Sequence, residues 1–533
     1  SELGLRYDLG RCSPSPFRPP PSPFRIVQPV VVIGAGINGA AAARELALSG
    51  ADVVVVDSAD IASGTTAYSS RLVHGGLRYL EYADTELVRE SLAERERLVT
   101  LAPDFVRPME FRVPVERRLG GFVDGLGKLL LGGKYKPRSR RGLWVVRFGL
   151  WWYDRLAADS SLPKSHVIRI GTNFLYPPAK RYHWLCAYSD AQMRFPEQFT
   201  TALLVDARRA AAEQGSHFAV HNYARVERAG KRLRILTRAG GVEEFEPAAV
   251  VNAGGPWGDD VTQALGCGNR RLLSGTKGSH IVVFRDDVRR ALDGAALYAE
   301  ASDGRPVFII PFGEATLIGT TDLPYEGDPA TAVASDAEID YLLDLAGNVL
   351  PSCPLTRVDV ALHYSGVRPL PFTDASTPAA ITRRHAIVEH PEMPWPTLTL
   401  VGGKLTTCRS LAEETAAAVL KKLGRSPSTN SRTRRIPSAL ADGGTITDER
   451  RVVGTDLSRG FVREVIRTQW VHTLDDLVER RLMLLFAREL RRATLEELAE
   501  LLIEERVLAA GTAGDAVAQT IERLRSHFGR VVE

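Results

Sequence analysis

Short apolar runs separated by glycine-rich segments dominate most of the chain. Val30–Ile33 is a continuous β-branched run, which is typical of a buried parallel strand. Residues 40–48 are rich in alanine and predict a helix that ends at Gly50. Val53–Val56 predicts a second strand, which leads directly into Asp57. The order of strand, glycine turn, helix, strand and acid predicts one complete βαβ unit.

Helical and extended patterns alternate along the rest of the chain. Helices are predicted at residues 199–214, 411–423, 473–505 and 514–528. Strands are predicted at residues 219–226, 232–237, 249–252, 281–284, 307–312 and 316–320, the last three in a second, mixed sheet. The pattern therefore predicts an α/β fold with two sheets, followed by a separate helical cap.

The first 27 residues differ from the rest, because six prolines lie between Arg11 and Arg25. Proline has no backbone N–H and a fixed φ angle, so this segment predicts an extended, flexible arm. It lacks the ordered charged, apolar and cleavage regions of a signal peptide, and none is predicted.

Composition narrows the class of protein. The 533 residues are 44% hydrophobic and 25% charged, as in ordinary globular proteins, and the net charge of +4 gives no reason to expect nucleic-acid binding. No apolar run reaches the roughly 18 residues of a membrane-spanning helix, so a soluble or peripheral protein is expected. The five cysteines are far apart and form no CxxC pair, so neither disulfides nor a bound metal is expected.

The glycines at the first predicted turn have the spacing GxGxxG, at Gly34, Gly36 and Gly39. In a βαβ unit the first allows a tight turn, the second lets the backbone approach a pyrophosphate, and the third lets helix pack on strand. Asp57 stands 23 residues after Gly34, where a carboxylate accepts a hydrogen bond from an adenosine ribose. The motif predicts a site for FAD or NAD rather than NADP, whose ribose carries a phosphate.

The segment after Asp57 favours FAD over NAD. Residues 63–66 and 69–71 are rich in small hydroxyl side chains, and His74 is followed by two glycines. Such residues let the backbone run close to a planar ring, whereas an NAD enzyme usually has a crossover helix here. Two more glycines, in residues 252–257, follow a predicted strand and also suit a closely approaching ligand.

Six longer stretches resemble a known family. They are IGAGINGA at 33–40, SSRLVHGGLRYLE at 69–81, KGSHIVV at 277–283, IGTTD at 318–322, SGVRPL at 365–370 and GGKLTT at 402–407. With these motifs in this order, over roughly residues 28–425, the chain resembles the FAD-dependent, quinone-linked glycerol-3-phosphate dehydrogenases, a group of the amino-acid-oxidase-like flavoenzymes.

The resemblance implies a Rossmann-like FAD-binding domain, a mixed-sheet substrate domain and a C-terminal helical cap. The expected extents are 1–27 for the arm, 28–100, 200–265 and 395–425 for the FAD-binding domain, 101–199 and 266–394 for the substrate domain, and 430–533 for the cap.

The resemblance also implies FAD as cofactor and sn-glycerol 3-phosphate as substrate, oxidised to dihydroxyacetone phosphate. The residues expected to contact FAD are Gly34, Gly36, Asn38, Gly39, Asp57, Thr65, Ser70, His74, Gly75, Gly76, Gly254, Gly403, Leu405 and Thr406. Arg78, Tyr79, Arg305 and Lys404 are expected to bind the substrate.

Two residues are assigned to catalysis. Arg368 would join Arg78 and Lys404 in a clamp for the dianionic phosphate. His280 is the expected general base, because imidazole titrates near working pH and the alcohol proton must leave as hydride passes to flavin N5. Residues 402–407 open a helix, whose N-terminus would face the flavin ring carbonyl, and Lys404 in this segment could serve either the substrate or the flavin.

Residues 117–153 combine nine basic residues with a single acid, Asp124, and with leucine and tryptophan clusters. This composition is typical of a surface that lies on anionic lipid, but a solvated basic loop beside buried aromatics explains it equally well. Since a quinone acceptor is dissolved in the bilayer, we expect a cytoplasmic protein attached peripherally to the cytoplasmic face of the membrane. A homodimer is compatible with the sequence.

Other functions are also compatible with the sequence. One is an oxidoreductase of the same scaffold with a different hydroxy or amino substrate, or an oxygen-using glycerol-3-phosphate oxidase. Another is a flavin-binding protein without turnover that docks through the basic patch at 117–147. The family's acidic Asp-Asp-Ala-Arg segment is replaced at residues 191–197, which puts the substrate specificity in doubt.

Overall fold

A computed structural model describes most of the chain. The described residues are 28–82, 84–118, 142–157, 161–171, 181–268, 270–300, 306–373, 384–427, 431–438 and 448–533. The expected arm at 1–27, Arg305, the side chain of Arg78 and residues 119–141 of the basic segment therefore lie outside the description.

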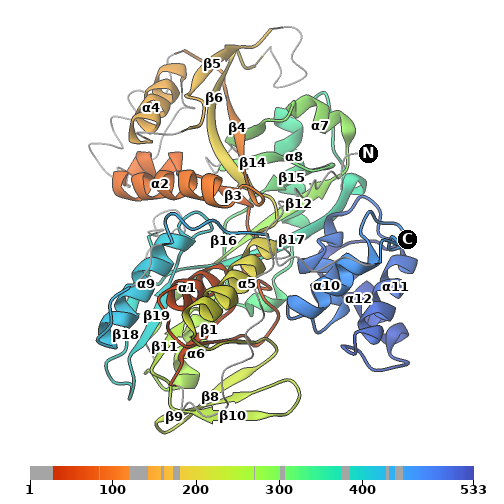
Figure 1. Cartoon of the computed structure of the whole chain (residues 1–533). Coiled ribbons are helices and arrows are strands. Elements are labelled where there is room, and N and C mark those ends of the chain that lie inside the picture. Colours follow the sequence, from red (N-terminus) through yellow and green to blue (C-terminus); the bar gives the residue numbers. More distant parts are fainter. Residues whose placement is uncertain are drawn as a thin grey trace.

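A six-stranded sheet lies in the lower half of the molecule as drawn in Figure 1. Its strands, in spatial order, are β18 (Ala386–Glu389), β19 (Thr397–Val401), β11 (Ala249–Asn252), β1 (Val30–Ile33), β2 (Val53–Val56) and β7 (Phe218–His221). Neighbouring strands are parallel except β18 and β19. The predicted βαβ unit forms the centre of this sheet.

Both faces of this sheet are covered. One face packs against helices α1 (Ile37–Leu48), α5 (Pro196–Gln214) and α9 (Cys408–Lys422). The other packs against α6 (Gly258–Leu265) and a small antiparallel sheet of β8 (Arg225–Ala229), β9 (Arg232–Leu236) and β10 (Val242–Phe245). Alternate valines of β1 and β2 face opposite layers, which explains why every position in these strands is apolar.

A second, ten-stranded sheet stands above the first (Figure 1). Its main path is β16 (Leu323–Pro324), β12 (Leu273–Val283), β15 (Ala315–Gly319), β14 (Pro306–Phe312), β13 (Ala296–Glu300), β4 (Val106–Val115), β6 (Trp184–Met193) and β3 (Leu72–Val73). In addition, β17 (Val360–Pro371) pairs with β12, and β5 (His166–Arg169) pairs with β6. Only β13 and β4 are parallel among the described pairs, so the sheet is mixed, as predicted.

Helices cover the second sheet on both sides. On one side lie α2 (Thr85–Leu101) and α4 (Leu143–Leu156), and on the other α7 (Asp286–Leu292) and α8 (Asp336–Val349). Short 3-10 helices are η1 (Leu77–Tyr82), η3 (Gly255–Trp257), η4 (Pro329–Thr331) and η5 (Arg357–Asp359). No helix in the described part of the chain is long and apolar enough to cross a membrane.

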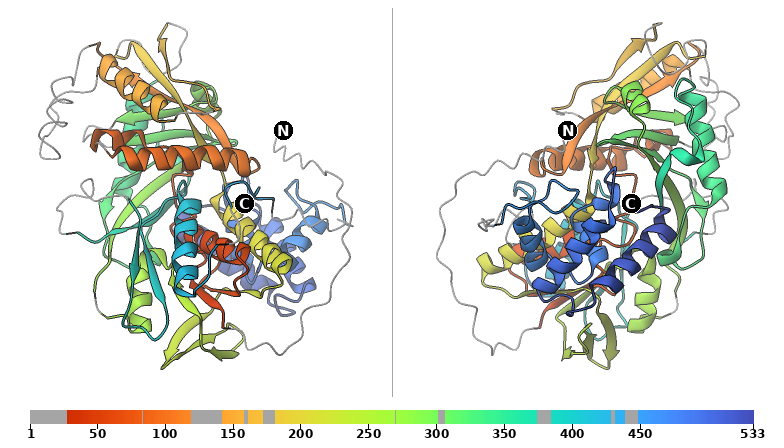
Figure 2. Two further views of the ribbon diagram at one scale, coloured as in Figure 1. Left: turned by 60° about the vertical axis from the view of Figure 1, so that its left-hand side comes forward. Right: turned by 90° about the vertical axis from the view of Figure 1, so that its right-hand side faces the viewer.

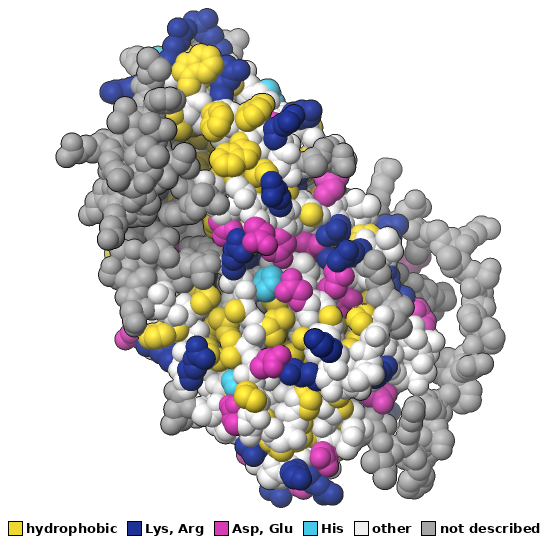
Figure 3. Space-filling model, turned by 90° about the vertical axis from the view of Figure 1, so that its left-hand side faces the viewer, with side chains coloured by type: hydrophobic (Ala, Val, Ile, Leu, Met, Phe, Trp, Pro, Cys, Tyr) yellow, Lys and Arg dark blue, Asp and Glu magenta, His cyan; other side chains and the backbone are white. Residues whose placement is uncertain are grey.

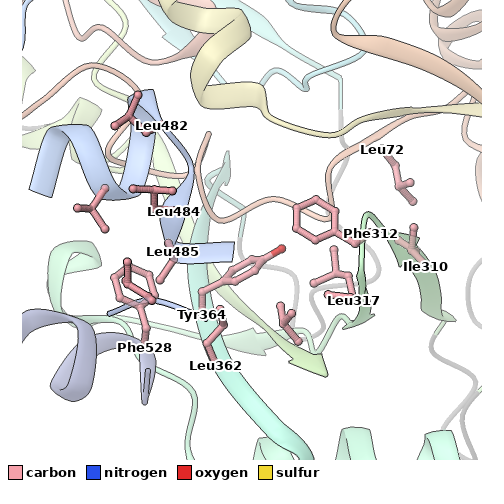
Figure 4. Packing of buried hydrophobic residues seen from close by; sticks show 14 of the residues in the cluster. Leu72, Ile310, Phe312, Leu317, Leu362, Tyr364, Leu482, Leu484, Leu485 and Phe528 are labelled. Carbon is pink, nitrogen blue, oxygen red and sulfur yellow. The ribbon is translucent and has the colours of Figure 1, made fainter. Parts of the chain in front are cut away.

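The C-terminal helices lie beside the ends of both sheets, as the views in Figure 2 show. They are α10 (Arg459–Thr468), the π-helix η7 (Asp476–Arg481), η8 (Leu484–Phe486), α11 (Arg492–Glu504) and α12 (Ala513–Phe528). Leu485 and Phe528 belong to the same hydrophobic cluster as Leu362 and Tyr364 of β17 (Figure 4). We call residues 448–533 the cap, although their core is continuous with that of the second sheet.

Two predicted elements are interrupted. The strand predicted at 219–226 is two strands, β7 and β8, which belong to different sheets because the chain turns at Asn222 and Tyr223. The long helix predicted at 473–505 is broken by the π-helix and by Met483, whose φ angle of 56° is left-handed. The spacing of apolar residues does not reveal such breaks, because the same spacing continues through them.

Candidate functional site

The GxGxxG turn joins β1 to α1 with the backbone shape that the motif predicts. Gly34 has a φ angle of +108°, and a Cβ atom there would lie 2.4 Å from the carbonyl oxygen of Ala253. A Cβ atom on Gly39 would lie 1.9 Å from the Gly34 carbonyl oxygen. The N-cap residue of α1 is Gly36, which has no side chain to cap the first turn. The positive end of this helix is therefore suited to a phosphate.

Asp57 lies at the carboxyl end of β2 and bonds the glycine turn. Its Oδ2 atom accepts a hydrogen bond from Ala35 N at 2.6 Å, and its Oδ1 atom accepts one from Ala59 N at 2.9 Å. Burial raises the pKa of its carboxyl to about 6, although the two backbone bonds act in the opposite direction. The acid expected to bind a ribose is thus held next to the expected phosphate site.

Asn38 links the first turn of α1 to the glycines at 402–403. Its Nδ2 atom donates to the Gly402 carbonyl at 3.2 Å, and a Cβ atom on Gly403, where φ is +94°, would lie 2.4 Å from Nδ2. The Oδ1 atom of Asn38 is buried and has no hydrogen-bond partner among the described residues. An unsatisfied buried acceptor on the first turn of α1 fits the binding of a polar group at this place.

A cavity of about 180 Å³ lies between the two sheets. It is lined by Thr65, Tyr68, Ser69, Ser70, Arg71, Leu72, His74, Tyr79, His280, Gly366, Arg368, Pro369, Leu370, Pro371, Gly402, Gly403, Lys404, Leu405 and Thr406. Four segments that are distant in sequence thus meet at one place. Each of them contains or adjoins a motif quoted above. The sequence did not assign a role to Tyr68, Ser69 and Arg71 in this wall, nor to apolar members such as Gly366 and Pro369.

The predicted site residues divide into two groups. The cavity wall contains Thr65, Ser70, His74, Tyr79, His280, Arg368, Gly403, Lys404, Leu405 and Thr406. Outside this wall, the glycine turn and its surroundings contain Gly34, Gly36, Asn38, Gly39, Asp57 and Gly254. Gly75 and Gly76 also lie outside the wall, in the loop that follows His74.

His280 is on β12, between β17 and β15 of the second sheet, and its side chain is buried. The ring stacks on Tyr364 with centroids 4.8 Å apart, and Nε2 shares a hydrogen bond of 2.9 Å with Ser70 Oγ. A Cβ atom on Gly319 of the adjacent strand would lie 2.0 Å from the ring, so the glycine makes room for it. Burial, followed by the positive charges of Arg368 and Arg71, lowers the pKa of His280 well below its ordinary value. The imidazole is therefore neutral at pH 7.

Arg368 lies on β17, next to β12, and its guanidinium reaches the cavity. Nη1 pairs with Asp322 at 3.0 Å, and Nη2 donates to Thr320 Oγ1 at 3.0 Å. A Cβ atom on Gly278 would lie 2.2 Å from Nη2, so only glycine leaves space for this guanidinium. Asp322 and Gly278 lie in two quoted motifs but were assigned no role from the sequence, and both shape the position of Arg368.

Lys404 and Tyr79 meet across the cavity wall. The Lys404 ammonium lies 4.1 Å from the centroid of the Tyr79 ring, which is a cation–π contact. The backbone N–H of His74 donates to Thr406 Oγ1 at 3.1 Å, so the His74 loop is tied to the start of α9. Two expected substrate residues, Tyr79 and Lys404, are therefore close to each other, whereas Arg78 and Arg305 stay untested predictions.

Residues 191–197, where the family motif is replaced, do not line the cavity. Instead, Glu197 forms a buried, bidentate pair with Arg71, at 2.6 and 2.9 Å. Arg71 is one of the cavity-lining residues. The altered segment therefore acts on the site through Arg71 rather than by touching its contents.

These features fit FAD. The glycine turn, Asp57 and Asn38 would hold the adenosine and pyrophosphate portion, while the residues of the cavity would surround the ring. The hydroxyl-rich loop, the neutral imidazole and two cations supply the donors and acceptors that a flavin and an anionic substrate require.

Comparisons with known proteins identify the family of this chain. The family described as FAD-dependent oxidoreductases matches residues 29–416. A glycerol-3-phosphate dehydrogenase of Synechocystis is 37% identical over 430 residues, covering 77% of this chain and 73% of the relative. The aerobic glycerol-3-phosphate dehydrogenase of Escherichia coli is 35% identical, covering 72% of each chain.

A solved structure has the same fold over nearly the whole length. The glycerol-3-phosphate dehydrogenase of Bacillus halodurans, complexed with FAD, superposes with a TM-score of 0.64 at 21% identity and covers 94% of this chain and 95% of its own. FAD is accordingly the cofactor of this enzyme. The chain belongs to the family of FAD-dependent oxidoreductases and, within it, to the group of the glycerol-3-phosphate dehydrogenases that its motifs indicated.

Proposed function

We propose that the enzyme oxidises sn-glycerol 3-phosphate to dihydroxyacetone phosphate and passes the electrons to a membrane quinone. The observation that carries this proposal is the cavity, where a neutral imidazole and two cationic side chains, His280, Arg368 and Lys404, line one space. A secondary alcohol that carries a dianionic phosphate needs this combination. The relatives named above are glycerol-3-phosphate dehydrogenases, which supports the same substrate.

Arg368 and Lys404 are proposed to hold the phosphate. Arginine presents a planar set of donors to phosphate oxygens, and lysine adds a point charge. Asp322 and Thr320 bond the guanidinium and fix its orientation in the cavity wall. Tyr79 orients the Lys404 ammonium through its ring. Arg78 and Arg305 stay candidates for the same clamp.

His280 is proposed to take the proton of the C2 hydroxyl. Its lowered pKa keeps the imidazole neutral and able to accept a proton at pH 7. Ser70 and Tyr364 hold the ring in place by a hydrogen bond and a stacked contact. FAD, when bound, supplies the acceptor for the hydride from C2.

Helix α4 supports the proposed contact of the enzyme with a membrane. Its exposed face presents Trp144, Phe148 and Trp151, which are 54%, 61% and 56% exposed. The Arg147 guanidinium lies 5.0 Å from the Trp144 ring and that of Arg155 lies 5.9 Å from the Trp151 ring. Figure 3 shows hydrophobic side chains bordered by basic ones at this end of the molecule. Such a face suits peripheral binding to anionic lipid, where a quinone is dissolved.

The primary test is anaerobic mixing of the purified holoenzyme with glycerol 3-phosphate while the flavin absorption band is followed. Rapid bleaching is expected, and reoxidation by a soluble quinone analogue should exceed reoxidation by oxygen. A flavin that stays oxidised would reject the substrate. Faster reoxidation by oxygen, with formation of hydrogen peroxide, would identify an oxidase instead.

The α4 face is tested by sedimentation with vesicles of phosphatidylcholine and phosphatidylserine. The double variant Trp144→Ser and Trp151→Ser should lose most vesicle binding, whereas Val358→Ser, which removes a still more exposed apolar side chain elsewhere, should bind like the wild type. Unchanged binding by the double variant would reject the membrane contact. A change from dimer to monomer without loss of vesicle binding would assign this face to a second copy of the chain.

A further inference from the structure

The pocket loop, residues 57–71, lies between the cavity and the cap. Five of its residues line the cavity. Thr66 Oγ1 accepts a hydrogen bond from Ile37 N at the start of α1, at 3.0 Å, and Thr65 Oγ1 donates to the Val367 carbonyl at 2.6 Å. Ala62 and Arg71 have left-handed φ angles of 60° and 58°. Such angles cost free energy in residues other than glycine, so surrounding contacts must hold this loop in shape.

The first such contact is at Asp60, whose side chain is 1% exposed. Arg481 of the cap donates to both carboxylate oxygens, at 2.7 and 2.9 Å, and Arg480 Nε donates at 2.5 Å. Burial alone would raise the pKa of Asp60, but the charges of Arg481 and then Arg480 lower it below its ordinary value. The carboxylate is therefore ionised and depends on the cap for its counter-charge.

The cap contacts the other end of the loop as well. The ring of Phe486 lies 4.6 Å from the Arg71 guanidinium, and Tyr68 lies against His527 and Phe528 with ring centroids 5.7 and 6.3 Å away. Both Tyr68 and Arg71 line the cavity. The hydrophobic cluster in Figure 4 continues behind these contacts, from Leu485 of the cap to Phe312 of the second sheet. The cap thus holds the loop at three points.

The geometry of the cap favours this arrangement. Arg480 and Arg481 are the last two residues of η7, a π-helix in which Leu482 N bonds the Leu477 carbonyl at 2.8 Å. π-helical turns are rare and often occur at functional sites. Consecutive side chains of a helix normally point in different directions, yet the side chains of Arg480 and Arg481 both bond Asp60. The cap also lies beyond residue 416, where the match to the family ends.

We propose that the cap holds the pocket loop in the shape that binds FAD, and that Arg480 and Arg481 are positioning residues for the cofactor. The contact acts through Asp60, which stands three residues after Asp57, the acid beside the phosphate-binding turn. Loss of the pair leaves a buried charge without its partners, and the loop moves to hydrate it. The inference concerns FAD retention and does not depend on the identity of the substrate.

The test compares Arg481→Lys with Arg467→Lys. Each substitution keeps the positive charge and removes one bidentate pair, but Arg467 pairs with Glu505 on the cap surface, with both contacts at 2.7 Å. The dissociation constant for FAD is measured from the fluorescence of flavin released on dilution of the holoenzyme. Arg481→Lys should raise it at least tenfold, whereas Arg467→Lys should change it less than twofold. At saturating FAD, the KM for glycerol 3-phosphate should stay near the wild-type value in both variants.

A second readout separates positioning from general stability. On heating Arg481→Lys holoenzyme, flavin fluorescence should rise well before the helical circular dichroism is lost. An FAD dissociation constant within twofold of the wild type, or FAD release that coincides with unfolding as in the wild type, would overturn the proposal. If Arg481→Lys does not fold, Phe486→Leu, which changes a half-buried contact with Arg71, is measured in the same way with the same expected outcome.

Discussion

The two sheets contribute different chemical groups to the candidate site, backbone at the first sheet and side chains at the second. At the end of the six-stranded sheet, the site is made by backbone: Gly34 and Gly39 approach other backbone atoms where any side chain would collide. At the ten-stranded sheet, side chains from the paired strands β12 and β17, His280 and Arg368, project into the cavity. A helix that follows a parallel strand presents its N-terminal N–H groups at the end of the sheet, whereas antiparallel neighbours place functional side chains side by side.

This difference predicts that substitutions at the two parts of the site alter different properties of the enzyme. A change in the backbone site should remove the cofactor together with local structure, because the same atoms shape both. A change in the side-chain site should leave FAD bound and alter turnover or substrate binding. The predictions below test that separation, beginning with the largest effect.

Gly39→Ala is expected to have the largest effect. Its methyl group would overlap the Gly34 carbonyl, 1.9 Å away, so the βα turn must open. Overpacking of this kind costs about 3 kcal/mol, and we expect purified protein with little bound FAD. The ratio of flavin to protein absorbance and the thermal unfolding midpoint measure this. Gly347→Ala, where a Cβ atom meets no neighbour, is the matched control and should be yellow and stable. A fully loaded Gly39→Ala enzyme would contradict the backbone account.

His280→Gln is expected to keep FAD but to slow flavin reduction by glycerol 3-phosphate. Loss of a general base typically costs roughly 10²–10⁴-fold in rate. Stopped-flow absorbance measures the reduction rate, with His183→Gln, an exposed histidine, as control. A normal rate in His280→Gln would remove this residue from the proton transfer. Loss of FAD from the variant would show that the two halves of the site are not separable.

The pH dependence follows from the direction of the His280 shift. Burial and then Arg368 lower its pKa, so the neutral form persists as pH falls, and protonation begins only well below pH 6.5. The flavin reduction rate should therefore stay level from pH 7.5 to pH 6.5 and decline only at lower pH. In Arg368→Met, the loss of the positive charge should move the decline to higher pH. A wild-type decline centred at or above pH 6.5 would contradict this assignment.

Asp322→Asn should have the smallest effect. The Asp322–Arg368 pair is partly exposed, with side chains 18% and 22% accessible, so its loss costs only about 1 kcal/mol. We expect a roughly fivefold rise in KM for glycerol 3-phosphate with little change in kcat, because Arg368 remains but is less well oriented. Steady-state kinetics measure both constants. A large fall in kcat at constant KM would place Asp322 in the chemical step instead.

Local patterns were sufficient for part of the molecule. The βαβ unit at 30–57 and the glycine spacing follow from contacts within a few dozen residues, so the short valine strands and α1 could be predicted. The two breaks, at Asn222 and at the π-helix, could not, because each is stabilised by distant partners: Asn222 Nδ2 bonds Asp60 and the Trp470 carbonyl. The glycine spacing named Gly34, Gly36, Gly39 and Asp57, whereas the substrate and catalytic residues were named through resemblance to a family.

The sequence by itself determined the class of fold, the place of the dinucleotide turn and the residue types available for chemistry. Only the tertiary structure decided that His280, Arg368 and Lys404 share one cavity, that Glu197 supports Arg71, and that Asp60 is bound by the cap. The physical reason is distance along the chain. Hydrophobic periodicity and turn chemistry act over neighbouring residues, whereas a buried charge such as Asp60 is satisfied by arginines that lie more than four hundred residues away in sequence.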